Sequence, residues 1–84
     1  MMDCFITFHS VTFAQRGESE LKRVGISCNV QRTPRWMEEQ GCGYSLRVRC
    51  KDISMAVELL RHRQVPFRKV YLRGEDGTLE ETAL

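Results

Sequence analysis

Cys42 lies between two glycines, in the segment Gly41-Cys42-Gly43. Glycine neighbours remove side-chain shielding and leave backbone N–H groups free to approach a ligand or an anion. A thiol reacts as its thiolate, which a helix N-terminus or a nearby cation stabilises. The segment therefore predicts an accessible thiol that acts as a nucleophile or as a covalent carrier. Composition leaves a second interpretation open, in which the segment is a tight turn that tolerates a small residue.

The elements that must position this thiol can be predicted from hydrophobic periodicity. Strands are expected over residues 4–9, 26–31, 44–50 and 67–72, and apolar residues alternate with polar ones in the first three. One helix should begin at Ser10 or Thr12 and end at Gly25, with Gly17 weakening its middle. A second should begin at Asp52 and end before Pro66.

This order of elements predicts an α+β fold, a ferredoxin-like βαββαβ sandwich. Its antiparallel sheet would have the order fourth, first, third and second strand, with both helices on one face and the other face open. A chain of 84 residues suffices for about one core. We therefore expect one domain over residues 1–72, followed by a loose acidic tail over residues 73–84.

In that topology, four chain segments meet at one edge of the sheet: the end of the first strand, the start of the first helix, the end of the second strand and the start of the third. His9, Ser10, Arg35 and Cys42 should converge there. His9 would be a proton partner of the thiol, and Arg32 and Arg35 would supply positive charge. Ser10, Gly41 and Gly43 would complete the binding residues. A histidine at a strand end is also compatible with an exposed polar group that has no such role.

The remaining cysteines, Cys4, Cys28 and Cys50, fall in register with apolar residues. Buried cysteine behaves as a small hydrophobe, so we expect three packed thiols. Cys4 and Cys50 could lie near each other at the far edge, but packing is the simpler account and no disulfide framework is expected. The sequence has no Cys-x-x-Cys pair and no pair of histidines at zinc-ligand spacing, so no metal site is predicted.

Charge and hydropathy narrow the cellular setting and the partners. Residues 1–72 contain 12 Lys or Arg and 7 Asp or Glu, whereas residues 73–84 contain one Arg and four acids. No basic leader with an apolar core and no membrane-length apolar segment is recognisable, so a cytoplasmic protein with reduced thiols and no membrane contact is expected. Arg47 and Arg49 would lie on the open face, but the third strand lacks the aromatic pattern of RNA-binding sheets. Nucleic acid is therefore not an expected partner.

Several motifs together resemble one family of small bacterial and archaeal domains, the selenium/sulfur (Se/S) carrier-like proteins. The motifs are Ile6-Thr7-Phe8-His9-Ser10, Thr33-Pro34-Arg35, Gly41-Cys42-Gly43 and Leu46-Arg47-Val48. The resemblance covers residues 4–72 and both helices, and it leaves out the acidic tail.

The resemblance implies a carrier that holds sulfur or selenium on Cys42 as a persulfide or selenopersulfide. Such a protein would work between a donor, such as a cysteine desulfurase, and an acceptor enzyme. It would need no other cofactor, and it would be a carrier more than a free-standing enzyme. The sequence leaves open which element is carried. It also leaves open a non-catalytic module that dimerises or binds RNA through its open face, and a redox sensor that forms an intermolecular disulfide through Cys42.

Overall fold

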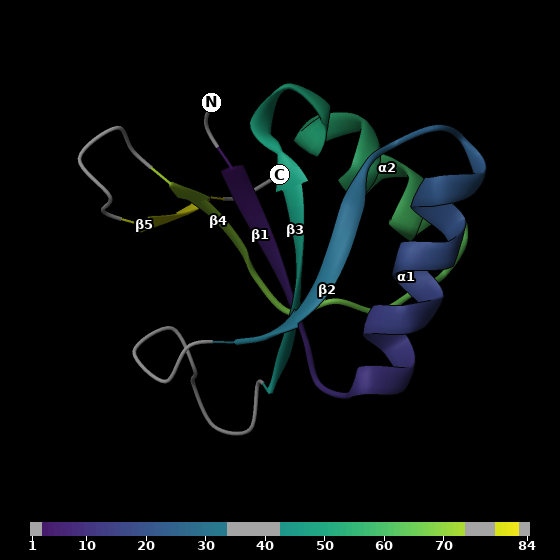
Figure 1. Ribbon diagram of the computed structural model, residues 1–84, viewed down its shortest axis with the longest axis horizontal. Helices are drawn as coiled ribbons and strands as arrows, with labels where there is room; N and C mark the ends of the chain where they lie inside the picture. Colours follow the sequence, from purple (N-terminus) through teal and green to yellow (C-terminus); the bar gives the residue numbers. More distant parts are fainter. Residues whose placement is uncertain (1–2, 34–42, 74–78, 83–84) are drawn as a thin grey trace.

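The computed structural model describes residues 3–33, 43–73 and 79–82, and it contains both strands and helices (Figure 1). The elements are β1 (Asp3–Phe8), α1 (Val11–Arg23), β2 (Cys28–Arg32), β3 (Tyr44–Arg49), the 3-10 helix η2 (Cys50–Asp52), α2 (Ile53–His62), β4 (Val70–Arg73) and β5 (Leu79–Thr82). Neither helix in this part of the chain is long and apolar enough to cross a membrane.

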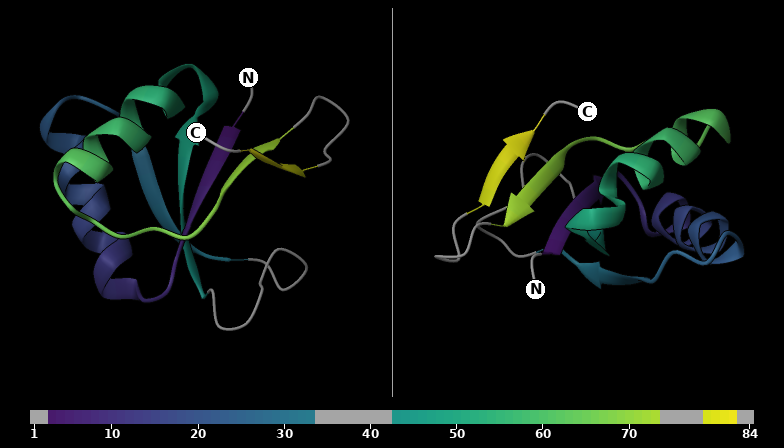
Figure 2. Two further views of the ribbon diagram at one scale, coloured as in Figure 1. Left: turned by 180° about the vertical axis from the view of Figure 1, so that it is seen from behind. Right: turned by 90° about the horizontal axis from the view of Figure 1, so that it is seen from above.

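The strands form one antiparallel sheet in the order β2-β3-β1-β4-β5. Both helices lie on the same face of this sheet (Figure 2). The predicted α+β class is confirmed, as are the expected pairings of β1 with β3 and β4 and of β2 with β3. The predicted strand order is incomplete because the sheet has five strands instead of four.

The additional strand, β5, comes from the segment that was expected to be a loose acidic tail. Glu81 stands opposite Tyr71 of β4, and its carboxylate lies 3.2 Å from the ammonium nitrogen of Lys69. The segment Leu79–Thr82 has no apolar alternation of its own. It becomes a strand because the outer edge of β4 offers backbone partners and Lys69 offers a charge, neither of which a local pattern reveals.

The strand β4 begins at Val70, three residues later than predicted, because the chain bulges opposite Thr7. The Thr7 N–H donates to the Lys69 carbonyl at 2.9 Å, and the Thr7 carbonyl accepts from the Arg68 N–H at 2.7 Å. Arg68 and Lys69 thus both stand opposite Thr7, and two residues opposite one define a β-bulge. The Thr7 hydroxyl also accepts from the Lys69 N–H at 3.0 Å. A buried threonine therefore fixes the entry of β4 into the sheet.

Helix α1 begins and ends where its capping residues predict. Ser10 is the N-cap, and its hydroxyl oxygen accepts from the Phe13 N–H at 3.4 Å, so the alternative start at Thr12 is wrong. Gly25 ends the turn with a φ of 83°, a conformation that favours glycine. Gly17 is buried, and a Cβ built on it would lie 3.2 to 3.3 Å from side-chain carbons of the sheet and of α2. This glycine costs helix propensity but allows α1 to approach the sheet closely.

The core lies between the sheet and the two helices. It consists of the alternate strand residues that face the helices and of the inward residues of α1 and α2. Its buried members are Cys4, Ile6, Phe8, Ala14, Leu21, Ile26, Cys28, Leu46, Val48, Ile53, Ala56, Val57, Leu60, Val65 and Val70.

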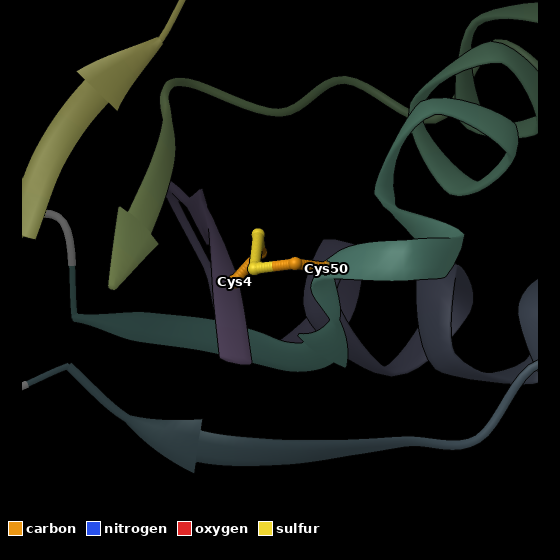
Figure 3. Close-up of a disulfide and its surroundings, with 2 residues drawn as sticks. All are labelled: Cys4 and Cys50. Carbon is orange, nitrogen blue, oxygen red and sulfur yellow. A yellow bond between two sulfur atoms is a disulfide. The ribbon is translucent and has the colours of Figure 1, made fainter. Parts of the chain in front are cut away.

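A disulfide between Cys4 and Cys50 corrects the expectation that these two cysteines are packed thiols (Figure 3). Cys4 stands opposite Val48 in the sheet, and the chain turns into η2 directly after β3. This turn brings the Cα of Cys50 to 5.1 Å from that of Cys4, within the range that a disulfide spans. The prediction was wrong because it inferred the redox state from the compartment instead of from the register between β1 and β3.

Reduction of the disulfide should lower the stability of the domain. The bond joins residues that are 46 positions apart, and its loss releases that loop in the unfolded chain. We expect the free energy of unfolding to fall by about 2 to 4 kcal/mol. Urea unfolding with and without dithiothreitol measures this change, and Cys4→Ser should show the lower value in both conditions. Equal midpoints for oxidised and reduced wild type would contradict a closed disulfide.

Gly17→Val should destabilise the protein. The added carbons would overlap Phe8 Cζ, Leu46 Cδ1 and Leu60 Cδ2, and overpacking of this kind costs about 1 to 3 kcal/mol. Thermal unfolding followed by circular dichroism measures the loss. Ser19→Val, at an exposed position of the same helix, is the matched control and should change stability much less. Because valine has a higher helix propensity than glycine, a similar loss in both variants would show that the contacts of Gly17 do not set the effect.

Candidate functional site

One end of the sheet gathers the described candidate residues. Phe8, Tyr44 and Arg32 stand in a single row across β1, β3 and β2. The Thr33 N–H donates to the Gly43 carbonyl at 2.9 Å, which extends the pairing of β2 and β3 by one residue. The end of β1, the start of α1, the end of β2 and the start of β3 therefore lie together, as Figure 1 shows.

The thiol itself and two predicted partners, Cys42, Gly41 and Arg35, lie outside the described residues. Gly43 follows Cys42 in the chain and is described, and we call Gly43 and the described residues around it the framework.

His9 and Ser10 lie at this end and differ in how their side chains are used. His9 follows β1 and is exposed. Ser10 is half-buried, and its oxygen accepts the hydrogen bond that caps α1. The Ser10 hydroxyl therefore has a structural role, while its proton remains available to an acceptor.

Arg32 belongs to the same end of the sheet but to its other face. Residues that stand opposite one another across neighbouring strands point to the same side. Arg32 is thus in the row of Phe8 and Tyr44, which faces the helices, whereas Gly43 and Thr33 belong to the next row, on the face away from the helices. The exposed Arg32 side chain is therefore on the helix face of the sheet, and the Thr33–Gly43 pair is on the opposite face.

Two buried hydroxyls near Gly43 are features that the sequence analysis missed. Thr33 is 4% exposed and Ser45 is 0% exposed. Thr33 Oγ1 and Ser45 Oγ have no hydrogen-bond partner within the described structure. Unpaired buried polar atoms are costly, and they are uncommon outside sites that receive a ligand, a water or an ion. The strand pattern places both residues away from the helices, but nothing in the sequence indicates that their hydroxyls lack partners.

Gly43 has no close neighbour on its Cβ side among the described residues. A Cβ built on Gly43 would lie more than 4 Å from every described atom outside its chain neighbours. Gly43 directly follows Cys42 in the chain. Its neighbours in the sheet, Thr33 and Ser45, contribute hydroxyl groups on the same face. Together they place two buried hydroxyl groups near Gly43, and each can donate a hydrogen bond to an anion or a thiolate that reaches it.

Cys28 has the opposite character, that of an inert thiol. It is 4% exposed, and its sulfur donates to the Glu18 carbonyl at 3.8 Å. Burial, followed by the nearby Glu18 carboxylate, raises the pKa of the Cys28 thiol, although Lys22 opposes the shift. The neutral thiol is therefore favoured near neutral pH. The prediction that Cys28 is a packed core cysteine is confirmed.

The face away from the helices is less open than expected. Arg47 and Arg49 are exposed on it, but Phe5, Thr7 and Ser45 on the same face are buried. An RNA-stacking platform requires exposed aromatic rings, whereas on this face Phe5 is only 4% exposed and Tyr71, opposite it in β4, is half-buried. Within the ranges that the structure describes, no group of three His, Cys, Asp or Glu residues could hold a metal ion.

Comparison with known proteins identifies the family. The family model described as "Putative Se/S carrier protein-like" matches residues 3–72, which covers every described element except the end of β4 and β5. Searches of curated proteins and of solved structures gave no match. The match includes both sides of the Gly41-Cys42-Gly43 segment and the framework residues around it. By this match the chain belongs to the Se/S carrier-like family.

Proposed function

We propose that the protein carries sulfur or selenium as a persulfide or selenopersulfide on Cys42. The observation that supports this most is the state of the other three cysteines. Cys4 and Cys50 are joined in a disulfide, and Cys28 is a buried thiol with a raised pKa. Cys42 is the remaining cysteine of the sequence. Family membership supports a carrier role, and this elimination supports Cys42 as the residue that would hold the cargo.

Loading would be a thiol–persulfide exchange. The Cys42 thiolate attacks the outer sulfur of a persulfide on a donor such as a cysteine desulfurase, and the donor cysteine leaves as a thiolate. Cys42 then carries the terminal sulfur, and no electron is gained or lost overall. Delivery repeats the exchange in reverse, with an acceptor nucleophile attacking that terminal sulfur. The carrier needs no resident cofactor for either step.

The residues around Gly43 would hold the loaded group. A persulfide is anionic near neutral pH, and the buried Thr33 and Ser45 hydroxyls can each donate one hydrogen bond to an anion. His9, which is exposed at the end of β1, would exchange the proton of the thiol. Of the two predicted arginines we favour Arg35, because Arg32 starts from the helix face of the sheet.

The setting follows from the chemistry. Persulfide exchange requires a free thiolate on Cys42, so we place the protein in the cytoplasm, although a disulfide such as Cys4–Cys50 is uncommon in that compartment. The open end of the sheet would be the docking region for donor and acceptor enzymes. The alternative module that dimerises or binds RNA through the face bearing Arg47 and Arg49 has weaker support, because the Phe5 ring on that face is buried.

Cys42→Ser should abolish loading from a cysteine desulfurase. Wild-type protein incubated with the desulfurase and cysteine should gain sulfur that dithiothreitol removes, measured by intact mass. Cys28→Ser is the matched control and should load as well as wild type, because the buried thiol is not the acceptor. Equal gain in wild type and Cys42→Ser would remove Cys42 from the proposal.

Alkylation should separate the two free cysteines of the oxidised protein by rate and by pH. Cys42 should react first, with its half-maximal rate at a pH below the value of about 8.5 that is typical of a free thiol. Cys28 should react more slowly and at higher pH, because burial raises its pKa. Peptide mapping with iodoacetamide follows both residues, and His9→Asn should move the Cys42 profile to higher pH. A Cys42 profile like that of free cysteine would remove the case for an activated thiol.

A further inference from the structure

The Cys4–Cys50 disulfide has two unlike halves. Cys4 is 0% exposed in β1, under the helices, whereas Cys50 is only partly buried at the start of η2. The close-up in Figure 3 shows the bond joining β1 to the turn that leads into α2. A small nucleophile that approaches from solvent would therefore reach the Cys50 side of the bond first.

We propose that Cys50 is a second covalent site for sulfur or selenium, loaded directly from hydrosulfide or hydroselenide. The anion attacks Cys50 Sγ, a new bond forms between the incoming chalcogen and that sulfur, and the Cys4–Cys50 bond breaks. Cys50 becomes a persulfide or selenopersulfide, and Cys4 leaves as a thiolate. The disulfide supplies the oxidation level of the product, so the step needs no other oxidant.

The unequal burial of the two residues makes Cys50 the more accessible sulfur but places the leaving thiolate on the buried Cys4. A thiolate on Cys4 would be a charge enclosed by apolar side chains, which disfavours the ionised form. The proton of the new persulfide, which is a stronger acid than a thiol, moves to Cys4. The single negative charge of the incoming anion thus ends on the partly exposed Cys50 persulfide. Next to Cys50 in the chain is the exposed Lys51, whereas Asp52 opposes that positive charge.

The same pair can release what it has bound. Cys4 remains on β1 opposite Val48, and its Cα is 5.1 Å from that of Cys50 when the bond is closed. Attack of the Cys4 thiolate on Cys50 Sγ re-forms the disulfide and expels hydrosulfide or hydroselenide. Loading and release are one reversible exchange, and the concentration of the free anion sets its direction.

This site is separate from the one proposed at Cys42. The six residues of β3 lie between Gly43 and Cys50, which at strand geometry is about 20 Å of chain. Cys42 receives sulfur from a protein persulfide, whereas Cys50 receives it from the inorganic anion. The two proposals can therefore fail independently.

The test exposes oxidised wild-type protein, without oxygen and without a desulfurase, to one equivalent of sodium hydrosulfide, and in a parallel arm to sodium selenide. Iodoacetamide then traps both persulfides and thiols, and only the persulfide adduct is removed by dithiothreitol. Peptide mapping should find the dithiothreitol-labile adduct on Cys50 and the stable adduct on Cys4. Cys42→Ser should give the same result.

Two controls remove the disulfide, which is the oxidant of the proposed step, while keeping Cys50. Cys4→Ser has no disulfide, and wild type that is reduced and desalted beforehand has none either, without any change of sequence. In both, the adduct on Cys50 should fall to the background of untreated protein. The proposal is overturned by an adduct on Cys50 in these controls equal to that of oxidised wild type, by a labile adduct on Cys4 instead, or by none in oxidised wild type.

Discussion

The pairing of β1 with β3 is the interaction on which the rest of the structure depends. It runs from Asp3 opposite Arg49 to Phe8 opposite Tyr44, and it places the two strands at the centre of the sheet. Strand side chains alternate between faces, so a shift of one residue would turn Ile6 and Leu46 out of the core. The same register brings Cys4 to the end of the strand from which Cys50 follows, and Gly43 to the opposite end.

Much of this architecture follows from the sequence because local patterns and tertiary contacts agree. The apolar alternation in β1 and β3, the Ser10 cap and the Gly25 stop each indicate the element that forms. The exceptions are features that depend on a distant partner. The bulge opposite Thr7 and the strand Leu79–Thr82 exist because β1 and β4 present backbone groups to them. A local pattern contains no information about such partners.

The candidate site likewise has features that the sequence predicts and features that depend on the packed structure. Topology alone was sufficient to bring His9, Ser10 and the start of β3 to one end of the sheet. The hydroxyls of Thr33 and Ser45 have no hydrogen-bond partner among the described residues. This could not be predicted, since the hydrogen bonding of a buried group is a property of the packed structure. The Cys4–Cys50 bond was missed for a different reason. The two residues are distant in sequence, and only the strand register together with the η2 turn shows that they meet.

The hydrogen bond between the Val30 N–H and the Glu18 carboxylate, at 3.2 Å, has a consequence for how the protein behaves among its neighbours. Val30 belongs to β2, an edge strand whose free N–H groups could otherwise pair with another chain. A carboxylate from α1 occupies one of these donors. At the other edge, the glutamates of β5 place negative charge where a second strand would have to approach. Both edges of the sheet thus resist edge-to-edge aggregation, which leaves the ends of the strands and the faces of the domain as the surfaces that another protein can approach.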